Sequence, residues 1–339
     1  MKKRIFSLLM LMSAFVLVLA ACQQADPKGS YAAAYKKLIS AKSYELTSDI
    51  SLKIDTSNLD DKNLKIAEVL NQSKFTINLK TNMETKESEA VFKGKIKVKN
   101  ITLDVNVPVY VDEKKQLGYM KLDSFIDYSG LLFRTPRMYP ENLKGKYLEF
   151  SLDEDEPTSE ETEEIQKQLM ESIQKASENL PEDKFKKAEL TNEEKEQGAA
   201  QKLTFQFNDK EIKAALIKLI EIAGDATGKT VQKNELANIK EGFQNITFKK
   251  FDVTSTIDNK ENLLTEKANI SVAVDNKDVQ RSFDINAFTT YKNIDGKITF
   301  DHKPKKENIV TEEEFRNMTS DDDQEDLHDL IDEETIESF

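Results

Sequence analysis

The sequence predicts an α+β fold, in which amphipathic helices cover one face of a single large, curved, antiparallel β-sheet. Two observations support this prediction. In two separate runs of the chain, apolar residues alternate with polar ones, which is typical of strands with one buried and one solvated face. Between these runs lie segments with helical spacing of apolar residues, and a sheet with one apolar face needs such helices to cover it.

The first run of strands follows a predicted helix at residues 31–42, for which Ser30 is the expected N-cap. Residues 63–70, between the first two strands, fit a short helix. The clearest strand is at 101–111, where every odd position is Ile, Leu or Val. The predicted strands of this run are at residues 44–54, 75–83, 90–98, 101–111, 117–122 and 146–152.

The middle of the chain predicts helices at residues 165–180, 212–223 and 236–243, together with short strands at 185–190 and 203–207. For the helix at 212–223, Asn208 or Asp209 is the expected cap, and Gly224 is expected just beyond its end.

The second run has strands at 246–257, 268–274 and 283–287. The apolar parity changes at Lys249-Lys250, which predicts a β-bulge there. Asp295-Gly296 predicts a hairpin turn between strands at 291–294 and 298–300. The two runs could form one sheet or two half-sheets. We favour one sheet, because the sequence contains no residue-level repeat.

Residues 1–21 have the form of a signal peptide, with a basic start and an apolar run too short to span a bilayer comfortably. The run ends in Leu19-Ala20-Ala21-Cys22, which resembles the bacterial lipobox. This resemblance implies that Cys22 carries a diacylglyceryl group and becomes the first mature residue. The chain would then be anchored to the extracytoplasmic face of the cell membrane. The alternative is a secretory signal followed by an incidental cysteine. Residues 22–30 would form a tether, and its last eight residues reach at most about 25–30 Å.

The formal net charge of −13 is concentrated at the C-terminal end. From residue 311 to residue 339 there are 13 acidic residues and one Arg. We therefore expect a folded domain at 31–302 and an acidic, disordered tail at 303–339. Nucleic acid is not an expected partner, because phosphate contacts need clustered Lys and Arg.

Two patterns connect the layout to a known group. One is Leu38-Ile39-Ser40-Ala41-Lys42-Ser43-Tyr44, where a helix leads through a small polar junction into a strand. The other is the strand pair at 117–122 and 145–150, whose second strand opens with Gly-Lys-Tyr. Both resemble the lipoprotein-carrier superfamily of LolA, LolB and LppX, and related Gram-positive lipoproteins, although relatives often have Trp where Tyr147 stands. The resemblance covers residues 31–301 at the level of layout.

The resemblance implies an open half-barrel that holds a lipid or other hydrophobic ligand between its sheet and its helices. A plain hydrophobic core would use the same residues. The candidate lining residues are Leu46, Ile50, Leu103, Val105, Leu216, Leu219, Ile270 and Val272.

No arrangement of catalytic groups, cofactor site or metal site stands out, so we expect no enzyme activity. Residues 223–230 fit only the loosest form of a phosphate loop and follow a helix rather than a strand. Residues 321–326 lack the turn glycine of an EF-hand loop. His302 and His328 have no partner at metal-ligand spacing.

Two non-enzymatic functions therefore compete. The chain is either a carrier of a hydrophobic ligand or a membrane-proximal module that docks on another envelope protein. The lysines from Lys93 to Lys99 either contact anionic headgroups or form an ordinary solvated strand face, which the alternation alone already predicts.

Overall fold

The computed structural model confirms an α+β chain and describes residues 26–57, 59–98, 101–123, 126–127, 141–152, 181–226, 233–276 and 279–319. Several predicted features lie outside these residues: the signal peptide, Cys22, the helix at 165–180, the phosphate-loop-like segment after residue 226 and residues 320–339 of the predicted tail. Residues 306–319, which were expected to belong to the disordered tail, contain a 3₁₀ turn, a short strand and a helix, so the predicted domain end at residue 302 is wrong. The described chain forms two compact units, each of which is described by itself below.

The first unit comprises residues up to Ile50 and residues 157–297. Its helices are α2 (Pro27–Ile39), α6 (Asn192–Glu196), α7 (Asp209–Ala226) and α8 (Lys233–Gly242). Its strands are most of β1 (Ser43–Ile54), then β7 (Phe185–Ala188), β8 (Ala199–Gln206), β9 (Ile246–Asp258), β10 (Leu263–Asn276) and β11 (Val279–Lys292). Short 3₁₀ turns lie at Glu182–Lys184 and Phe243–Asn245.

The second unit comprises residues 51–156 and those from Ile298 onward. Its helices are α3 (Asp61–Gln72) and α9 (Glu312–Thr319). Its strands are β2 (Lys74–Asn82), β3 (Glu87–Val98), β4 (Ile101–Asp112), β5 (Leu117–Lys121), β6 (Tyr147–Ser151) and β12 (Ile309–Val310). Short 3₁₀ turns lie at Glu141–Leu143 and Lys306–Asn308.

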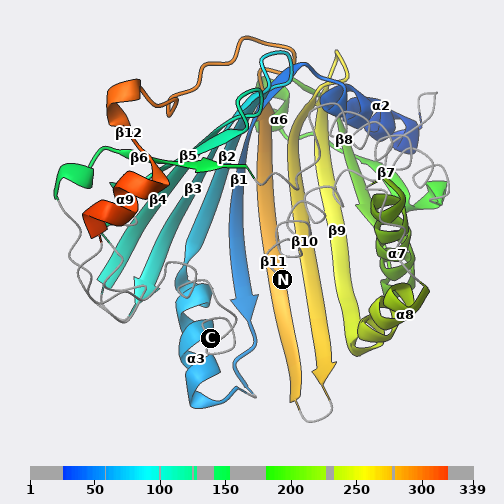
Figure 1. The fold of residues 1–339 in the computed structure, drawn as a ribbon. Coiled ribbons are helices and arrows are strands. Elements are labelled where there is room, and N and C mark those ends of the chain that lie inside the picture. Colours follow the sequence, from blue (N-terminus) through cyan, green and yellow to red (C-terminus); the bar gives the residue numbers. More distant parts are fainter. Residues whose placement is uncertain are drawn as a thin grey trace. The chain divides into compact units, whose positions relative to one another are not determined.

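The strands belong to one open 12-stranded sheet with the order β12-β6-β5-β4-β3-β2-β1-β11-β10-β9-β8-β7 (Figure 1). The expectation of one large sheet is therefore confirmed. The sheet is mostly antiparallel, and β12 pairs with β6 in parallel.

The predicted bulge is confirmed at one residue. Ser271 of β10 pairs with Lys250 of β9, but the next residue, Val272, pairs with Phe248. Lys249 is therefore the extra residue of the bulge. Because of it, the apolar residues before and after the bulge point to the same face of the sheet, although their sequence parity differs.

The first helix begins earlier than the sequence pattern predicts. Asp26, not Ser30, is the N-cap of α2, and its carboxylate accepts a hydrogen bond from the Gly29 N–H at 2.5 Å. Pro27 follows at the first helical position, where its missing N–H costs nothing. Ser30 lies inside the helix, so the predicted cap is wrong.

The predicted end of α7 is also wrong, because the helix continues through Gly224 to Ala226. One glycine disfavours a helix by only about 1 kcal/mol. Ile212 and Leu216 pack into the core of the first unit, and this packing outweighs the local preference.

The hairpin predicted at Asp295-Gly296 does not form. β11 ends at Lys292, and residues 298–300 are not a strand. The Asp295 N–H donates to the Ser43 carbonyl at 2.8 Å, and its carboxylate accepts from the Lys42 N–H at 2.7 Å. In the sheet order β1 is the neighbour of β11, so a returning strand has no free edge to pair with.

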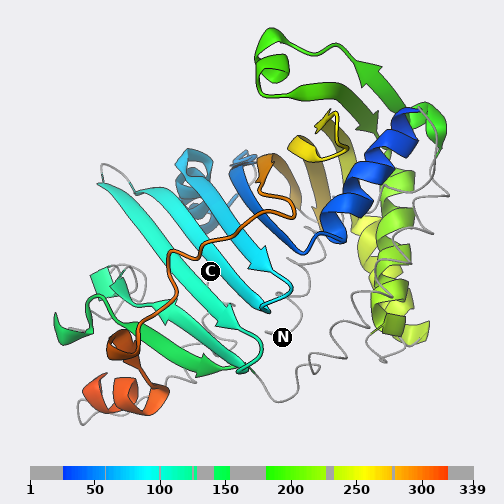
Figure 2. The same cartoon turned by 90° about the horizontal axis from the view of Figure 1, so that it is seen from above.

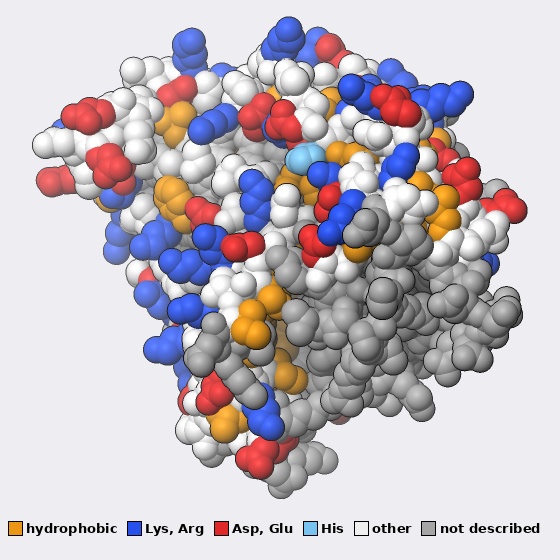
Figure 3. Space-filling model, turned by 90° about the vertical axis from the view of Figure 1, so that its left-hand side faces the viewer, with side chains coloured by type: hydrophobic (Ala, Val, Ile, Leu, Met, Phe, Trp, Pro, Cys, Tyr) orange, Lys and Arg blue, Asp and Glu red, His pale blue; other side chains and the backbone are white. Residues whose placement is uncertain are grey.

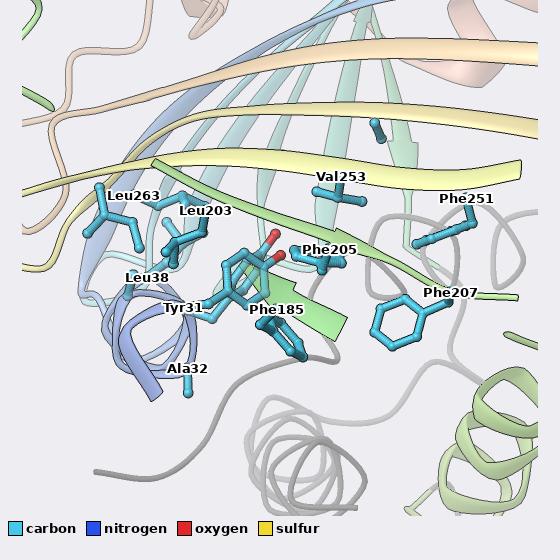
Figure 4. Packing of buried hydrophobic residues seen from close by; sticks show 14 of the residues in the cluster. Tyr31, Ala32, Leu38, Phe185, Leu203, Phe205, Phe207, Phe251, Val253 and Leu263 are labelled. Carbon is cyan, nitrogen blue, oxygen red and sulfur yellow. The ribbon is translucent and has the colours of Figure 1, made fainter. Parts of the chain in front are cut away.

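The core of the first unit lies between α2 and the strands β8, β9 and β10 (Figure 4). Tyr31 packs against Tyr35, Phe185 and Phe205 with ring centroids 4.7–6.0 Å apart. Ile212 of α7 belongs to the same cluster. Residues of α2 and Ile212 of α7 thus pack against the same cluster of strand residues.

Two smaller clusters of buried residues lie in the described part of the second unit. Tyr110, Tyr119 and Tyr147 are buried together on β4, β5 and β6, and Phe300 packs on Tyr110 at 5.7 Å between ring centroids. The other core joins Leu122, Leu143, Val310 and Phe315 next to α9. After Ile298 the chain (orange in Figure 2) runs across the strands of this unit to reach α9.

Candidate functional site

The clearest candidate binding surface is one face of the β2–β3–β4 ladder, which we call the apolar face. The register aligns Ile77 of β2, Phe92 of β3 and Val107 of β4 side by side. No position of this parity on the three strands carries a charged residue. The positions are Phe75, Ile77, Leu79, Thr81, Ser88, Ala90, Phe92, Gly94, Ile96, Val98, Ile101, Leu103, Val105, Val107, Val109 and Val111.

Part of the apolar face is accessible to solvent. Phe92 is 39% exposed and Ile101 is 58% exposed. The Phe75 ring stacks on Phe92 with centroids 5.8 Å apart and an interplanar angle of 25°. A chain with 33% charged residues thus keeps a contiguous, uncharged and partly open surface on three neighbouring strands.

The structure separates the sequence-predicted lining residues into two groups. Leu103 is buried and Val105 half-buried on the apolar face of the second unit. The others belong to the first unit. Leu46, Leu216 and Ile270 are brought together against its core.

The remaining three lining residues are Ile50, Val272 and Leu219. Ile50 and Val272 are half-buried on strands of the first unit. Leu219 lies on α7, and its side chain is outside the described residues.

A buried carboxyl group in the first unit was not predicted. Glu266 on β10 is 2% exposed and lies under α2. Its oxygens accept hydrogen bonds from the Tyr31 hydroxyl at 2.9 Å, the Tyr35 hydroxyl at 2.9 and 3.0 Å, and the Ser255 hydroxyl at 3.2 Å. The burial of Glu266 could have been predicted from the sequence. It lies two residues before the buried Ala268 on the same strand, so the alternation places both side chains on the buried face.

Burial dominates the electrostatics of this cluster. It raises the pKa of Glu266 to about 7, although the hydrogen bonds from Tyr31, Tyr35 and Ser255 lower it. Burial and the nearby Glu266 charge raise the pKa of Tyr31 and of Tyr35 well above the usual tyrosine value. The hydroxyl groups therefore stay protonated and act as donors to the carboxyl group.

The Glu266 cluster is suited to holding α2 rather than to catalysis. A general acid or base must come within hydrogen-bond distance of its substrate. Here Tyr31, Tyr35 and Leu38 of α2 are fully or almost fully buried around the carboxyl group. The cluster thus joins the first helix to the sheet.

A second polar cluster holds residues 299–303 against β2 and β3 within the second unit, on the face opposite the apolar face. The buried Glu89 accepts a hydrogen bond from the His302 N–H at 2.6 Å and lies 3.6 Å from Lys80 Nζ. Lys80 also donates to the Thr299 carbonyl at 2.9 Å and pairs with Asp301 at 2.6 Å. This network fixes the segment that leads to α9.

Glu87 extends this network. Burial raises its pKa, but hydrogen bonds from Lys303, Tyr110 and Thr85 outweigh that effect and lower the pKa to about 2. The ammonium group of Lys303 also lies 5.6 Å from the centre of the Tyr110 ring. Glu87 is therefore ionised at neutral pH and supports the attachment of residues 299–303.

His302, for which the sequence predicts no metal-binding partner, lies in this network, with its Nδ1 3.5 Å from the Tyr147 hydroxyl. In the part of the chain that the structure describes, no group of three His, Cys, Asp or Glu side chains is placed to hold a metal ion. Within the same residues, no helix is long and apolar enough to cross a membrane.

No protein-family model matches this chain, and no curated protein is significantly similar to it.

Proposed function

We propose that this chain is a non-enzymatic, lipid-anchored protein of the cell envelope, held to the membrane through Cys22. Its open sheet acts as a half-barrel that binds an acyl chain or a similar hydrophobic ligand. The observation that carries the proposal is the uncharged apolar face of β2–β4, with Phe92 and Ile101 left accessible.

The chemistry of this face suits an extended hydrocarbon chain. Neighbouring strands lie about 4.8 Å apart, so side chains of one parity form a continuous apolar surface. Each buried methylene contributes about 0.8 kcal/mol, and about ten methylenes would contribute about 8 kcal/mol before the cost of ordering the ligand. The face offers no charged partner, so the polar end of the ligand would remain in water.

The position of the helices supports the half-barrel reading. In the first unit, α2 and α7 pack on the apolar side of β8–β10, and Leu46, Leu216 and Ile270 lie against the same core. In our proposal, Leu46, Leu216 and Ile270 therefore belong to a helix-covered core. The ligand site is the more open surface around Phe92.

Native mass spectrometry tests the ligand. The chain from Gln23 onward, which contains every described residue, is incubated with membrane lipids. We expect a bound species that dissociates as phospholipid or fatty acid. The variant Phe92→Asp should lose this species. The matched control is Phe288→Asp on β11, because Phe288 is a similarly exposed phenylalanine in the other unit, at 45%.

Other outcomes of this experiment count against the proposal. If Phe92→Asp and Phe288→Asp reduce binding equally, the apolar face is not the site. If the unsubstituted chain takes up no lipid, the carrier reading fails. The exposed Phe92 and Ile101 would then favour docking on another envelope protein, which is the second candidate function.

The anchor is tested separately with the full-length chain in a bacterial host that processes lipoproteins. We expect labelled palmitate to be incorporated into the protein and the protein to fractionate with membranes. Both properties should be lost in Cys22→Ser. Incorporation that persists in Cys22→Ser would contradict the anchor assignment.

A further inference from the structure

A group of lysines lies on the β2–β3 ladder, on the face opposite the apolar face. We call Lys74, Lys93, Lys95 and Lys97 the lysine patch; all four are exposed. Figure 3 shows Lys and Arg side chains (blue) gathered along the left of its view. The members of the patch are assigned from the strand register.

The register brings these charges unusually close together. Lys74 of β2 lies directly opposite Lys95 of β3, so Lys93 and Lys97 are its diagonal neighbours. Directly opposed side chains on antiparallel strands have Cβ atoms about 5 Å apart, and diagonal neighbours are about 7–8 Å apart. Like charges directly opposite each other, as at Lys74 and Lys95, are destabilising. If this strand pair needed only a solvated face, it would be more stable with positively and negatively charged side chains opposite each other.

The remainder of the same face shows what a neutralised arrangement looks like in this protein. Lys80 is paired with Glu89 and Asp301, and Lys303 is paired with Glu87. Among the described residues, the lysine patch has one carboxylate within ion-pairing distance: Asp104 Oδ1, at 4.0 Å from Lys95 Nζ. Both partners of that pair are about 70% exposed. The patch thus keeps a local excess of positive charge beside a region that is charge-balanced.

We infer that the lysine patch binds the anionic headgroups of the membrane surface to which the chain is anchored. This inference rests on the membrane location proposed above, but it does not require the acyl ligand. Four flexible, hydrated ammonium groups on a strand pair match a diffuse anionic surface better than a single ligand, which needs a fixed fork of donors. A nearby polybasic surface gains about 1 kcal/mol per lysine.

The short tether makes such weak contacts effective. Cys22 is four residues from the N-cap of α2, so lipid anchoring keeps the folded chain close to the membrane. An anchored chain meets the surface at high effective concentration, so contacts that are weak in solution become occupied. The patch would then bias how the second unit lies on the membrane.

The test uses the chain from Gln23 onward, so that binding does not depend on the anchor, and sedimentation with vesicles. One vesicle set is pure phosphatidylcholine, and the other contains 30% phosphatidylglycerol. We expect binding to the anionic vesicles only, and weaker binding as salt is raised. Replacing the four patch lysines with Thr should lower the partition coefficient by about 600-fold, since each of the four lysines is worth about fivefold.

The matched control makes the same change in net charge at four exposed strand lysines of the first unit, Lys186, Lys187, Lys249 and Lys250. It should change the partition coefficient less than threefold. An equal loss in both variants would show that only net charge matters and would overturn the inference.

Two further results would also overturn it: no binding to anionic vesicles, or binding of soluble polyphosphate at the patch without binding to vesicles. If the vesicle assay gives one of these results while Cys22 still incorporates palmitate, the inference about the lysine patch is wrong, but the proposed membrane location is not contradicted.

Discussion

The buried Glu266 makes a specific prediction about stability and pH. Its pKa is raised from 4.5 to about 7 in the folded chain, chiefly by burial. Between these two pH values the folded state binds more protons than the unfolded chain, so the free energy of unfolding falls as the pH rises. The stabilisation is fully present below pH 4.5 and is lost as the pH rises through about 7.

The size of the effect follows from the pKa difference. At 1.36 kcal/mol per pKa unit, the first unit loses about 3 kcal/mol over the whole titration, most of it between pH 5 and pH 8. Glu266→Gln keeps a hydrogen-bonding amide in the same space but cannot ionise. Its stability should therefore change far less over this range.

The assay is urea unfolding at pH 5, 6, 7 and 8, followed by hydrogen exchange in peptides from α2 and β10, which report on the first unit alone. Glu241→Gln, at an exposed position on α8, is the matched control and should keep the unsubstituted pH dependence. Tyr35→Phe removes the donor that contacts both Glu266 oxygens and should move the pH midpoint upward. If Glu266→Gln loses stability with pH as steeply as the unsubstituted chain, the assignment is wrong.

Three further predictions concern the second unit. A Cβ at Gly118 would lie 2.2 Å from the Phe150 ring, so Gly118→Ala should cost about 1–3 kcal/mol in urea unfolding, and Phe150→Leu in the same chain should recover part of the loss. Glu89→Ala leaves the His302 N–H without its acceptor, so hydrogen exchange at residues 299–303 should become faster while β5 is unchanged. Asp60 caps α3 by accepting from the Asn63 N–H at 2.9 Å, so Asp60→Ala should cost about 1 kcal/mol, whereas Asp60→Asn should cost much less.

Local periodicity was sufficient to locate most of the strands. The alternation in β4 and the parity change at Lys249 both report which face of a strand is buried, and burial is a property that short segments encode. The short helix α6 was missed, although Thr191 and Glu194 form a complete capping box there. This capping box can be read from the sequence alone.

Features that depend on distant partners could not be predicted in this way. Asp295-Gly296 is a good hairpin signal, but Asp295 bonds to the start of β1, more than 250 residues away in the chain. Glu266 is tolerated in the core only because α2 supplies two tyrosine hydroxyls. The opposition of Lys74 and Lys95 depends on strand register, which the separate strand predictions did not specify.

The measurement that tests the central claim most directly is photo-crosslinking with a palmitate that carries a diazirine near the end of its acyl chain. The chain from Gln23 onward is labelled, digested and mapped by mass spectrometry. We predict crosslinks in peptides from β2, β3 and β4, centred on Phe92 and Ile101 and removed by excess unlabelled palmitate. Crosslinks confined to other strands, or labelling that excess palmitate does not reduce, would contradict the assignment of the apolar face as the ligand site.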